Sequence, residues 1–147
     1  MNLAFSVRSL SKVYQMGTEE VRALDGIDLD VPEGDYLAIM GPSGSGKSTL
    51  LNLLGCLDRS SGGSHEVNGI EVTKLSDNEL SKVRGESIGF FFQSYNLIPY
   101  LNVLDNIRMP RAYLRSSKDK LATAFALAQR IGLGDRVNHR PQELSGG

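Results

Sequence analysis

The chain has 147 residues, of which 40% are hydrophobic and 22% are charged, a composition typical of one globular domain with its own core. This composition excludes disordered, collagen-like and coiled-coil chains. The formal net charge of -1 gives no electrostatic reason to expect nucleic acid or an anionic membrane as the main partner, so any polyanion has to be bound locally.

The cysteine content and the N-terminal residues bear on the cellular setting. Cys56 is the only cysteine, so an intrachain disulfide is impossible and a reducing, cytoplasmic setting is favoured. No basic cluster or histidine stands near Cys56, and we expect a small buried residue rather than a nucleophile. Residues 1–14 are interrupted by Arg8 and Lys12 and lack the apolar run of a secretory signal. No window approaches the roughly 20 apolar residues of a membrane span, so a partner has to hold the protein at any membrane.

The first 57 residues predict a β region followed by a strand, a glycine loop and a helix. Residues 3–31 form short extended pieces, which indicate antiparallel strands. These pieces are separated by Gly17, Gly26 and Pro32. The run DYLAIM at 35–40 is typical of a strand buried on both faces. It leads directly into residues 41–49, and leucines then recur at helical spacing at Leu50, Leu51, Leu54 and Leu57.

A turn and a helix are predicted in the middle of the chain. Residues 60–72 indicate a loop and a strand, with a turn at Asn68-Gly69. Ser76 and Glu79 have the spacing of a capping box, which predicts a helix that begins there and ends at Gly85.

The last third contains a second predicted buried strand and further helices. The strand is SIGFFFQ at 87–93, and an aromatic and aliphatic stretch broken by Pro99 follows it at 94–107. Residues 116–134 predict an amphipathic helix that ends at Gly132. Its apolar face consists of Leu121, Ala124, Phe125, Ala128 and Ile131.

Residues 41–49, GPSGSGKST, carry the clearest chemistry in the chain. They match the phosphate-loop pattern G-x-x-x-x-G-K-[ST] between a predicted strand and a predicted helix. Glycines let backbone N–H groups turn toward phosphate oxygens, Lys47 reaches the terminal phosphates, and the Ser48 hydroxyl ligates Mg²⁺. The predicted ligands are a nucleoside triphosphate and Mg²⁺. The predicted binding residues are Gly41, Pro42, Ser43, Gly44, Ser45, Gly46, Lys47, Ser48 and Thr49.

Three further features narrow the class of phosphate-loop protein. The Asn-Lys-x-Asp element that selects guanine in GTPases is absent from the sequence. Tyr14 precedes the loop, Gln93 ends the second predicted buried strand, and LSGG occupies 144–147. In this order around the loop, the features resemble the ATP-binding subunits of ABC transporters.

The resemblance implies a role for each feature. Tyr14 stacks on adenine, a contact worth about 1–3 kcal/mol whichever base is bound. Gln93 ligates Mg²⁺ together with Ser48 and orients the attacking water, which a neutral amide does without competing for the proton. Lys47 and Gln93 are therefore the implied catalytic residues. The family signature caps the γ-phosphate of ATP held by a second subunit, and its residues here are Ser145, Gly146 and Gly147.

Residues 21–58 and 88–110 are most similar to the ABC subgroup that drives lipoprotein release and macrolide-type export. There, the segment after Gln93 forms a groove for a helix of an integral membrane partner. The apolar residues of 94–107 suit this role, and they equally suit packing inside a helical lobe. The implied protein is a homodimer that binds no nucleic acid and lies in the cytoplasm, peripheral at the inner face of the cell membrane.

The implied fold is an α/β phosphate-loop NTPase of ABC type, a single domain over 1–147. It has an antiparallel β subdomain and phosphate-loop core in 1–93 and the start of a helical subdomain in 94–147. Family members continue after LSGG with a helix, a strand ending in aspartate, a catalytic glutamate and a histidine. We therefore expect an N-terminal fragment that lacks the C-terminal part of the core, exposes apolar faces at 35–40 and 87–93, and is inactive alone.

The predicted function is ATP binding and, in the complete protein, ATP hydrolysis that energises export by a membrane partner. One alternative is an ABC ATPase without membrane domains, which the segment after Gln93 and the lack of a basic face disfavour. A second is a module that binds nucleotide without hydrolysing it. The sequence departs from the subgroup at His65-Glu66, where aromatic or aliphatic residues are common. His65 and His139 are expected to be ordinary surface or turn residues, because neither has a second metal ligand nearby.

Overall fold

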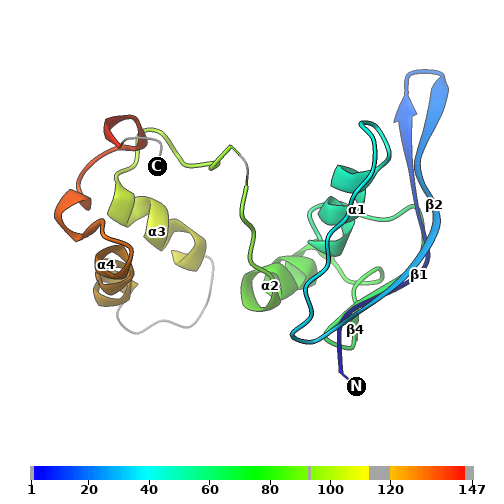
Figure 1. Cartoon of the computed structure of the whole chain (residues 1–147), viewed down its shortest axis with the longest axis horizontal. Helices are drawn as coiled ribbons and strands as arrows, with labels where there is room; N and C mark the ends of the chain where they lie inside the picture. The colour runs from blue at the N-terminus through cyan, green and yellow to red at the C-terminus, as the bar shows by residue number, and fades with distance from the viewer. Residues whose placement is uncertain (1, 93, 113–119, 145–147) are drawn as a thin grey trace. The chain divides into compact units, whose positions relative to one another are not determined.

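The computed structural model describes residues 2–92, 94–112 and 120–144, and the chain divides between Phe90 and Phe91 into two compact units (Figure 1). The first unit contains strands β1 (Leu3–Met16), β2 (Glu19–Pro32), β3 (Gly62–Val67) and β4 (Ile70–Glu71), and helices α1 (Lys47–Leu54) and α2 (Asp77–Ser87). The second contains helices α3 (Val103–Ala112) and α4 (Lys120–Arg130), and the 3-10 helices η1 (Gly134–Arg136) and η2 (Pro141–Glu143).

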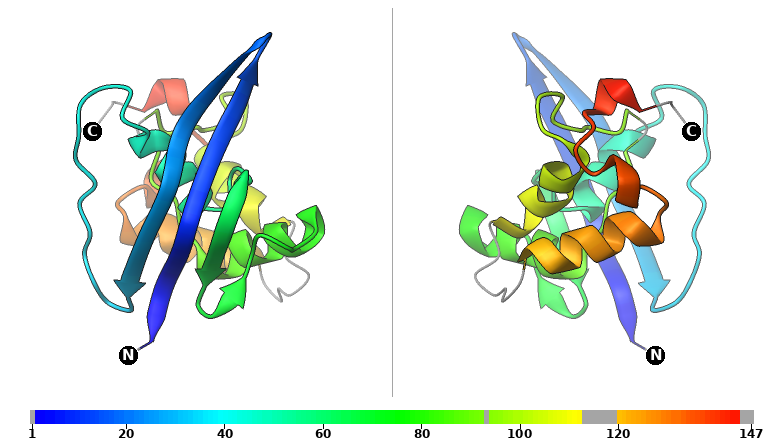
Figure 2. Two further views of the ribbon diagram at one scale, coloured as in Figure 1. Left: turned by 90° about the vertical axis from the view of Figure 1, so that its right-hand side faces the viewer. Right: turned by 90° about the vertical axis from the view of Figure 1, so that its left-hand side faces the viewer.

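An antiparallel sheet of order β2-β1-β3-β4 forms the first unit, which confirms the predicted antiparallel region. β1 pairs with β2 along most of its length, whereas β3 pairs only with the part of β1 from Phe5 to Ser11. The tip of the β1–β2 hairpin therefore extends beyond the rest of the sheet (Figure 2). The predicted turn at Asn68-Gly69 is confirmed, since both residues have positive φ and join β3 to β4 as a two-residue hairpin loop.

Helix α1 packs against one face of this sheet. Its leucines lie three and four residues apart, so they project from one side of the helix. The resulting hydrophobic cluster consists of Val7, Leu10, Leu24, Leu50, Leu53 and Leu54. The helical prediction is confirmed up to Leu54; Leu57 lies beyond the end of α1 and is exposed.

Helix α2 closes a second cluster under β3. This cluster consists of Cys56, Val67, Val72, Leu80 and Val83. Cys56 is buried, as expected, and burial raises the pKa of its thiol, which keeps it unreactive.

The start of α2 follows the sequence prediction and its end does not. The Ser76 N–H donates to the Glu79 carboxylate at 2.9 Å, and the Ser76 side chain accepts from the Glu79 N–H, so the predicted capping box is confirmed. The helix continues through Gly85 to Ser87, so the predicted end was wrong. Gly85 does not adopt the positive φ of a terminating glycine, and Arg84 fixes the last turn by donating to the Cys56 carbonyl at 2.8 Å.

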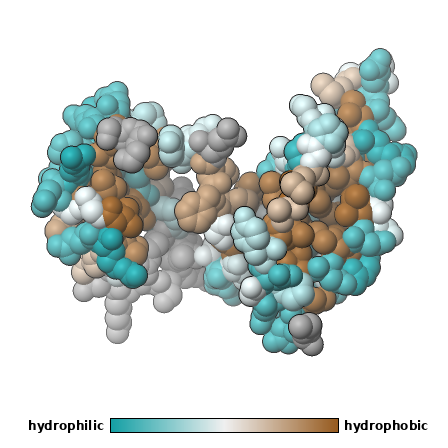
Figure 3. All heavy atoms as spheres, in the orientation of Figure 1, coloured by the Kyte–Doolittle hydropathy of each residue, from teal (hydrophilic) through white to brown (hydrophobic). Residues whose placement is uncertain are grey.

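The two segments predicted as buried strands are not strands. In the described part of the chain, neither 35–40 nor 88–92 pairs with another strand. Tyr36 is 92% exposed and Phe91 is fully exposed, which confirms that these segments present apolar side chains to solvent. A central parallel strand is held by neighbours on both sides, and no described residues supply them. Figure 3 shows hydrophobic residues gathered on the surface of the first unit.

Helices α3 and α4 pack against each other in the second unit. Of the predicted apolar face of α4, Ala124 and Ala128 are buried, whereas Phe125 and Ile131 are exposed. Gly132 follows α4 with a φ of 76°, as predicted for its C-terminal glycine. No helix among the described residues has both the length and the apolar character needed to cross a membrane.

The first turn of α3 is bonded to the segment after η1. The Val103 N–H donates to the His139 carbonyl at 2.9 Å, and the Leu104 N–H donates to the Val137 carbonyl at 3.1 Å. Two stretches that lie more than 30 residues apart in sequence are thereby joined at one helix end.

Candidate functional site

Residues 41–49 lead into α1 through Gly46, the residue that caps this helix. Gly46 has a φ of 84°, a conformation that favours glycine. A Cβ at this position would lie 2.5 Å from the Ala23 carbonyl oxygen and 3.0 Å from Leu24 Cδ2. The end of the loop is therefore seated directly on strand β2, and the helix begins at the next residue, Lys47.

Lys47 turns back over the loop. Its Nζ donates to the Pro42 carbonyl at 2.5 Å and to Ser45 Oγ at 3.4 Å. In the described part of the chain, no side chain caps α1, so the N–H groups of its first turn are available to an anion and add to the positive end of the helix. Ser48 is exposed at the same place. A loop with a fixed ammonium, available N–H groups and a hydroxyl fits a triphosphate with Mg²⁺.

Tyr14 lies on β1, half-buried, and its hydroxyl donates to Asp58 Oδ2 at 2.9 Å. Lys12 Nζ lies 4.8 Å from the centre of the Tyr14 ring and donates to Asp58 Oδ1 at 2.7 Å. The sequence reasoning missed Lys12 and Asp58. No local pattern could have found the pair, because they lie 46 residues apart and meet only through the fold.

Tyr14 and the loop lie on the same face of the sheet. The hydroxyl of Tyr14 reaches Asp58 just after α1, and Gly46 just before α1 rests on Ala23. Leu24, the neighbour of Ala23, pairs with Lys12 across the hairpin. Tyr14 lies two residues after Lys12 on β1, and two residues along a strand span about 7 Å. The Tyr14 position is therefore about 7 Å along the strand from the residue that pairs beside the loop contact.

Four of the predicted site residues lie outside the residues that the structure describes: Gln93, Ser145, Gly146 and Gly147. Their implied roles stay predictions.

The stretch after Gln93 exposes aromatic and aliphatic side chains, with Tyr95 at 71%, Leu97 at 48% and Tyr100 at 74%. One amide fixes its second half. Asn106 accepts from the Ile98 N–H at 2.9 Å, and its Nδ2 lies 3.0–3.2 Å from three backbone carbonyls. Those carbonyls belong to Ile98, Leu101 and Asn102. The sequence reasoning missed Asn106, although asparagine in a predicted helix is a weak signal of a local hydrogen-bonding role.

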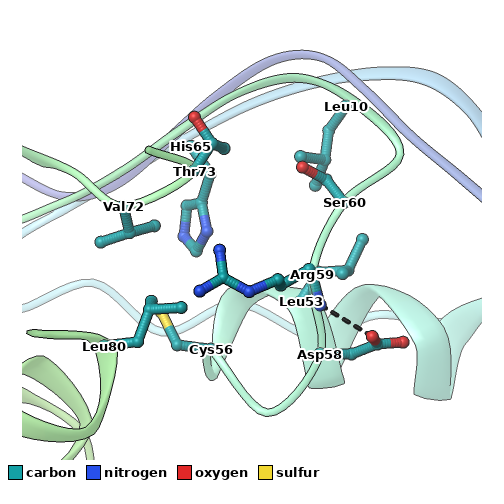
Figure 4. Close-up of a pocket in the computed structure, with 10 residues that line it drawn as sticks. All are labelled: Leu10, Leu53, Cys56, Asp58, Arg59, Ser60, His65, Val72, Thr73 and Leu80. Carbon is teal, nitrogen blue, oxygen red and sulfur yellow. Dashed lines mark hydrogen bonds between the residues drawn. The ribbon is translucent and has the colours of Figure 1, made fainter. Parts of the chain in front are cut away.

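His65 is a correction to the sequence prediction, because it is 3% exposed and not a surface residue. It alternates with Val67 on β3, so both side chains point into the core. The ring projects into a cavity of about 80 Å³ beside Arg59 (Figure 4). Its Nε2 has no hydrogen-bond partner in the described chain, and burial lowers the pKa of the imidazole against the opposing effect of Glu71.

The prediction of a surface position for the second histidine is confirmed. His139 is exposed in a turn, where its N–H donates to the Arg136 carbonyl at 2.9 Å. Across the described ranges, no group of three or more His, Cys, Asp or Glu side chains is arranged to hold a metal.

Comparison with known proteins places these observations in a family. The sequence model of the ABC transporter family matches residues 24–147. An uncharacterized ABC transporter ATP-binding protein of Thermotoga maritima is 49% identical over 137 residues, which cover 92% of this chain and 58% of that protein. The macrolide export ATP-binding/permease protein MacB of Bdellovibrio bacteriovorus is 48% identical over 143 residues, which cover 96% of this chain and 22% of that protein.

The fold has solved counterparts. The ATP-binding cassette MJ0796, in a dimeric post-hydrolysis state with ADP and Pi, matches with a TM-score of 0.85 at 39% identity. The match covers 97% of this chain and 63% of that one. The predicted α/β fold with its antiparallel N-terminal subdomain is thereby confirmed, and the chain spans 58% to 62% of the first three curated relatives.

Proposed function

Because the chain belongs to the ABC transporter family, we propose that it binds ATP with Mg²⁺ at residues 41–49 and that the complete protein hydrolyses ATP to drive export by a membrane partner. One observation carries the proposal. The Lys47 ammonium is fixed over a glycine loop at the start of α1, so positive charge converges on one point. That arrangement suits the terminal phosphates of ATP.

The chain's residues divide the work of binding and catalysis. Lys47 holds the terminal phosphates, Ser48 is a ligand of Mg²⁺, and Tyr14 stacks on adenine. Gln93 is the second Mg²⁺ ligand and orients the attacking water. When bound, Mg²⁺ neutralises charge on the phosphates.

A second copy of the protein completes the site. The MJ0796 cassette, 39% identical to this chain, is dimeric with ADP and Pi. We propose the same association here, head to tail, with Ser145, Gly146 and Gly147 of one subunit against the ATP of the other. The 147-residue chain alone binds nucleotide without hydrolysing it, in keeping with its coverage of 58% of the first relative.

The segment 94–107 is the proposed contact with the membrane partner, at the inner face of the cell membrane. Two exposed aromatic residues of this segment, Tyr95 and Tyr100, supply the apolar surface that such a contact needs. The relative MacB carries ATP-binding and permease functions under one name.

The first experiment measures ATP binding and hydrolysis by the complete protein with Lys47→Ala. Charged hydrogen bonds to phosphate contribute about 1.5–3 kcal/mol, so we expect ATP affinity to fall by about 10- to 100-fold and hydrolysis to be lost. Lys82→Ala, at an exposed lysine of α2, is the matched control and should leave both unchanged. Normal hydrolysis by Lys47→Ala would contradict the site assignment.

Two observations separate the proposal from its rivals. Co-purification with an integral membrane protein supports transport, whereas purification without one favours an ABC ATPase that has no membrane domain. Reading the coding sequence after Gly147 tests hydrolysis. A following glutamine-led helix, a strand ending in aspartate and a glutamate are expected, and their absence would leave a module that only binds nucleotide.

A further inference from the structure

We propose that Asp58 and Lys12 are positioning residues that fix the Tyr14 ring, so that a nucleotide base stacks on one defined face. The inference rests on the proposed ATP-binding function. It assigns a role to two residues that do not belong to the phosphate loop.

Asp58 is the centre of this arrangement, because three donors converge on its carboxylate. The Tyr14 hydroxyl donates to Oδ2 at 2.9 Å. Lys12 Nζ and the Arg59 N–H each donate to Oδ1 at 2.7 Å. The hydroxyl oxygen of a tyrosine lies on the χ2 axis, so a bond there restrains the tilt of the ring about χ1 and leaves rotation about χ2 to be limited by contacts on the ring faces. The Asp58 carboxylate therefore fixes where the far end of the ring lies.

Lys12 occupies one face of the ring. Its Nζ lies over the Tyr14 ring, 4.8 Å from the ring centre, and is held there by Asp58 and by the Arg59 carbonyl at 2.6 Å. The Lys12 side chain is only 11% exposed, so it is a fixed part of the structure. A base can then stack only on the opposite face of the ring.

Helix α1 connects the base and phosphate ends of the proposed site. The loop Gly46 precedes this helix and Asp58 follows it, and the Asp58 N–H donates to the Asn52 carbonyl at 3.3 Å. The leucines of α1 are buried against the sheet, which makes the helix a rigid spacer. Helix α1 therefore positions both the ring that binds the base and the loop that binds the phosphates.

The charges also suit a nucleotide. A lone carboxylate near a triphosphate would repel it, but Lys12 neutralises Asp58. Burial opposes ionisation of Asp58, and the hydrogen bonds from Lys12, Tyr14 and the Arg59 N–H outweigh it and lower the pKa of the carboxyl group. The Asp58 carboxylate therefore remains charged at neutral pH, and its salt bridge with Lys12 offsets that charge.

The test compares ligands that have a base with one that has none. Affinities for ATP and for inorganic tripolyphosphate, both with Mg²⁺, are measured on the complete protein with Asp58→Ala, with Tyr14→Phe and with both changes. A stacked base contributes about 1–3 kcal/mol, and we expect each single change to remove part of it and weaken ATP binding about 3- to 10-fold. Tripolyphosphate binding should change by less than about 2-fold, since the phosphate loop is untouched.

The double variant tests whether the two side chains act together. Because Asp58→Ala and Tyr14→Phe break the same hydrogen bond, the double change should weaken ATP binding no more than the worse single change. A spectroscopic measurement reports stacking directly. The emission of 2-aminopurine riboside triphosphate is expected to be quenched on binding to the unchanged protein and less quenched in both single variants.

Controls separate this inference from the proposed function. Asp30→Ala removes a carboxylate on β2 that accepts from Arg8 and Ser6, and should leave both affinities unchanged. If Tyr14→Ala leaves ATP affinity unchanged, base stacking itself fails and the inference falls with it. If Tyr14→Ala weakens ATP binding but Asp58→Ala and Tyr14→Phe do not, only the positioning role is overturned. Equal weakening of ATP and tripolyphosphate by Asp58→Ala also overturns it, because a general structural role would act that way.

Discussion

Asn106 and Ile98 exchange two hydrogen bonds: the Ile98 N–H donates to Asn106 Oδ1 at 2.9 Å, and Asn106 Nδ2 donates to the Ile98 carbonyl at 3.2 Å. The Asn106 side-chain amide thus bonds both the N–H and the carbonyl of Ile98, as a residue of a neighbouring strand does in a β-sheet. It closes the loop that follows Gln93 onto the first turns of α3.

Asn106→Ala should loosen this loop. Each lost hydrogen bond contributes about 1 kcal/mol, so we expect hydrogen exchange at the Ile98 amide, which donates to Asn106, to quicken about 5- to 10-fold or more. Exchange at the Leu101 amide, which donates to the Ile98 carbonyl, should quicken with it as the loop loosens. Mass spectrometry of the exchanging protein measures this. Asn138→Ala, at an exposed asparagine of the same unit, is the control and should leave both amides protected. Unchanged exchange in Asn106→Ala would show that the loop does not depend on the amide.

His65 should make stability depend on pH. Its pKa in the folded protein is lowered below the ordinary value of 6.5 by burial, so below that pH the unfolded chain binds a proton that the folded chain does not. Stability is complete above pH 6.5 and is lost as the pH falls toward the folded pKa, by at most about 1.4 kcal/mol per pH unit. Glu71 opposes the lowering of this pKa, and the other ionisable side chains that line the same cavity are Cys56, Asp58 and Arg59.

Denaturant unfolding at several pH values between about 5 and 7.5 tests this effect, since ordinary carboxyl groups titrate below that range. His65→Leu should flatten the dependence, whereas His139→Leu, at an exposed histidine, should retain it. The same slope in His65→Leu and in the unchanged protein would refute the assignment.

Gly46→Ala should be more damaging than Gly44→Ala. Both glycines have a positive φ, 84° and 80°, so alanine pays about 1–2 kcal/mol at either one. Only at Gly46 would the new Cβ also overlap the Ala23 carbonyl oxygen. We therefore expect Gly46→Ala to lower both the unfolding free energy and ATP affinity further than Gly44→Ala. Equal effects would mean that contact with β2 is unimportant.

Ser76→Ala should destabilise the start of α2. The capping box is lost, and such caps contribute about 0.5–2 kcal/mol. Faster hydrogen exchange in the first turn of α2 measures the change, with Ser87→Ala, at the exposed end of the helix, as control. An effect of equal size at Ser87 would argue against the cap.

Local patterns in the sequence were sufficient wherever the interactions are local. The capping box at Ser76, the Asn68-Gly69 turn and the helix after Gly46 depend on residues within a few positions, and all three were predicted. The strands proposed at 35–40 and 87–93 did not form in the described residues because parallel pairing is non-local. Their exposure was expected for another reason, because family members form the neighbouring core strands from residues that follow LSGG.

The candidate site was only partly within reach of the sequence. Residues 41–49 follow a contiguous pattern, whereas the Lys12–Asp58 pair is created by the packing of α1 on the sheet. Burial of His65 was missed although the alternation with Val67 indicated it. The absence of a second metal ligand argues against a metal site at His65 and says nothing about whether the side chain is buried.

The bonds from Val103 to His139 and from Leu104 to Val137 restrict how the chain can vary in length. An inserted or deleted residue between Val137 and His139 would move one of these two bonds out of register, and one between Ile98 and Asn106 would disturb the bonds that Asn106 makes to Ile98. Homologues of this protein should therefore differ in length elsewhere. If an alignment of homologues places a gap in either stretch, we expect the true insertion or deletion to lie outside it.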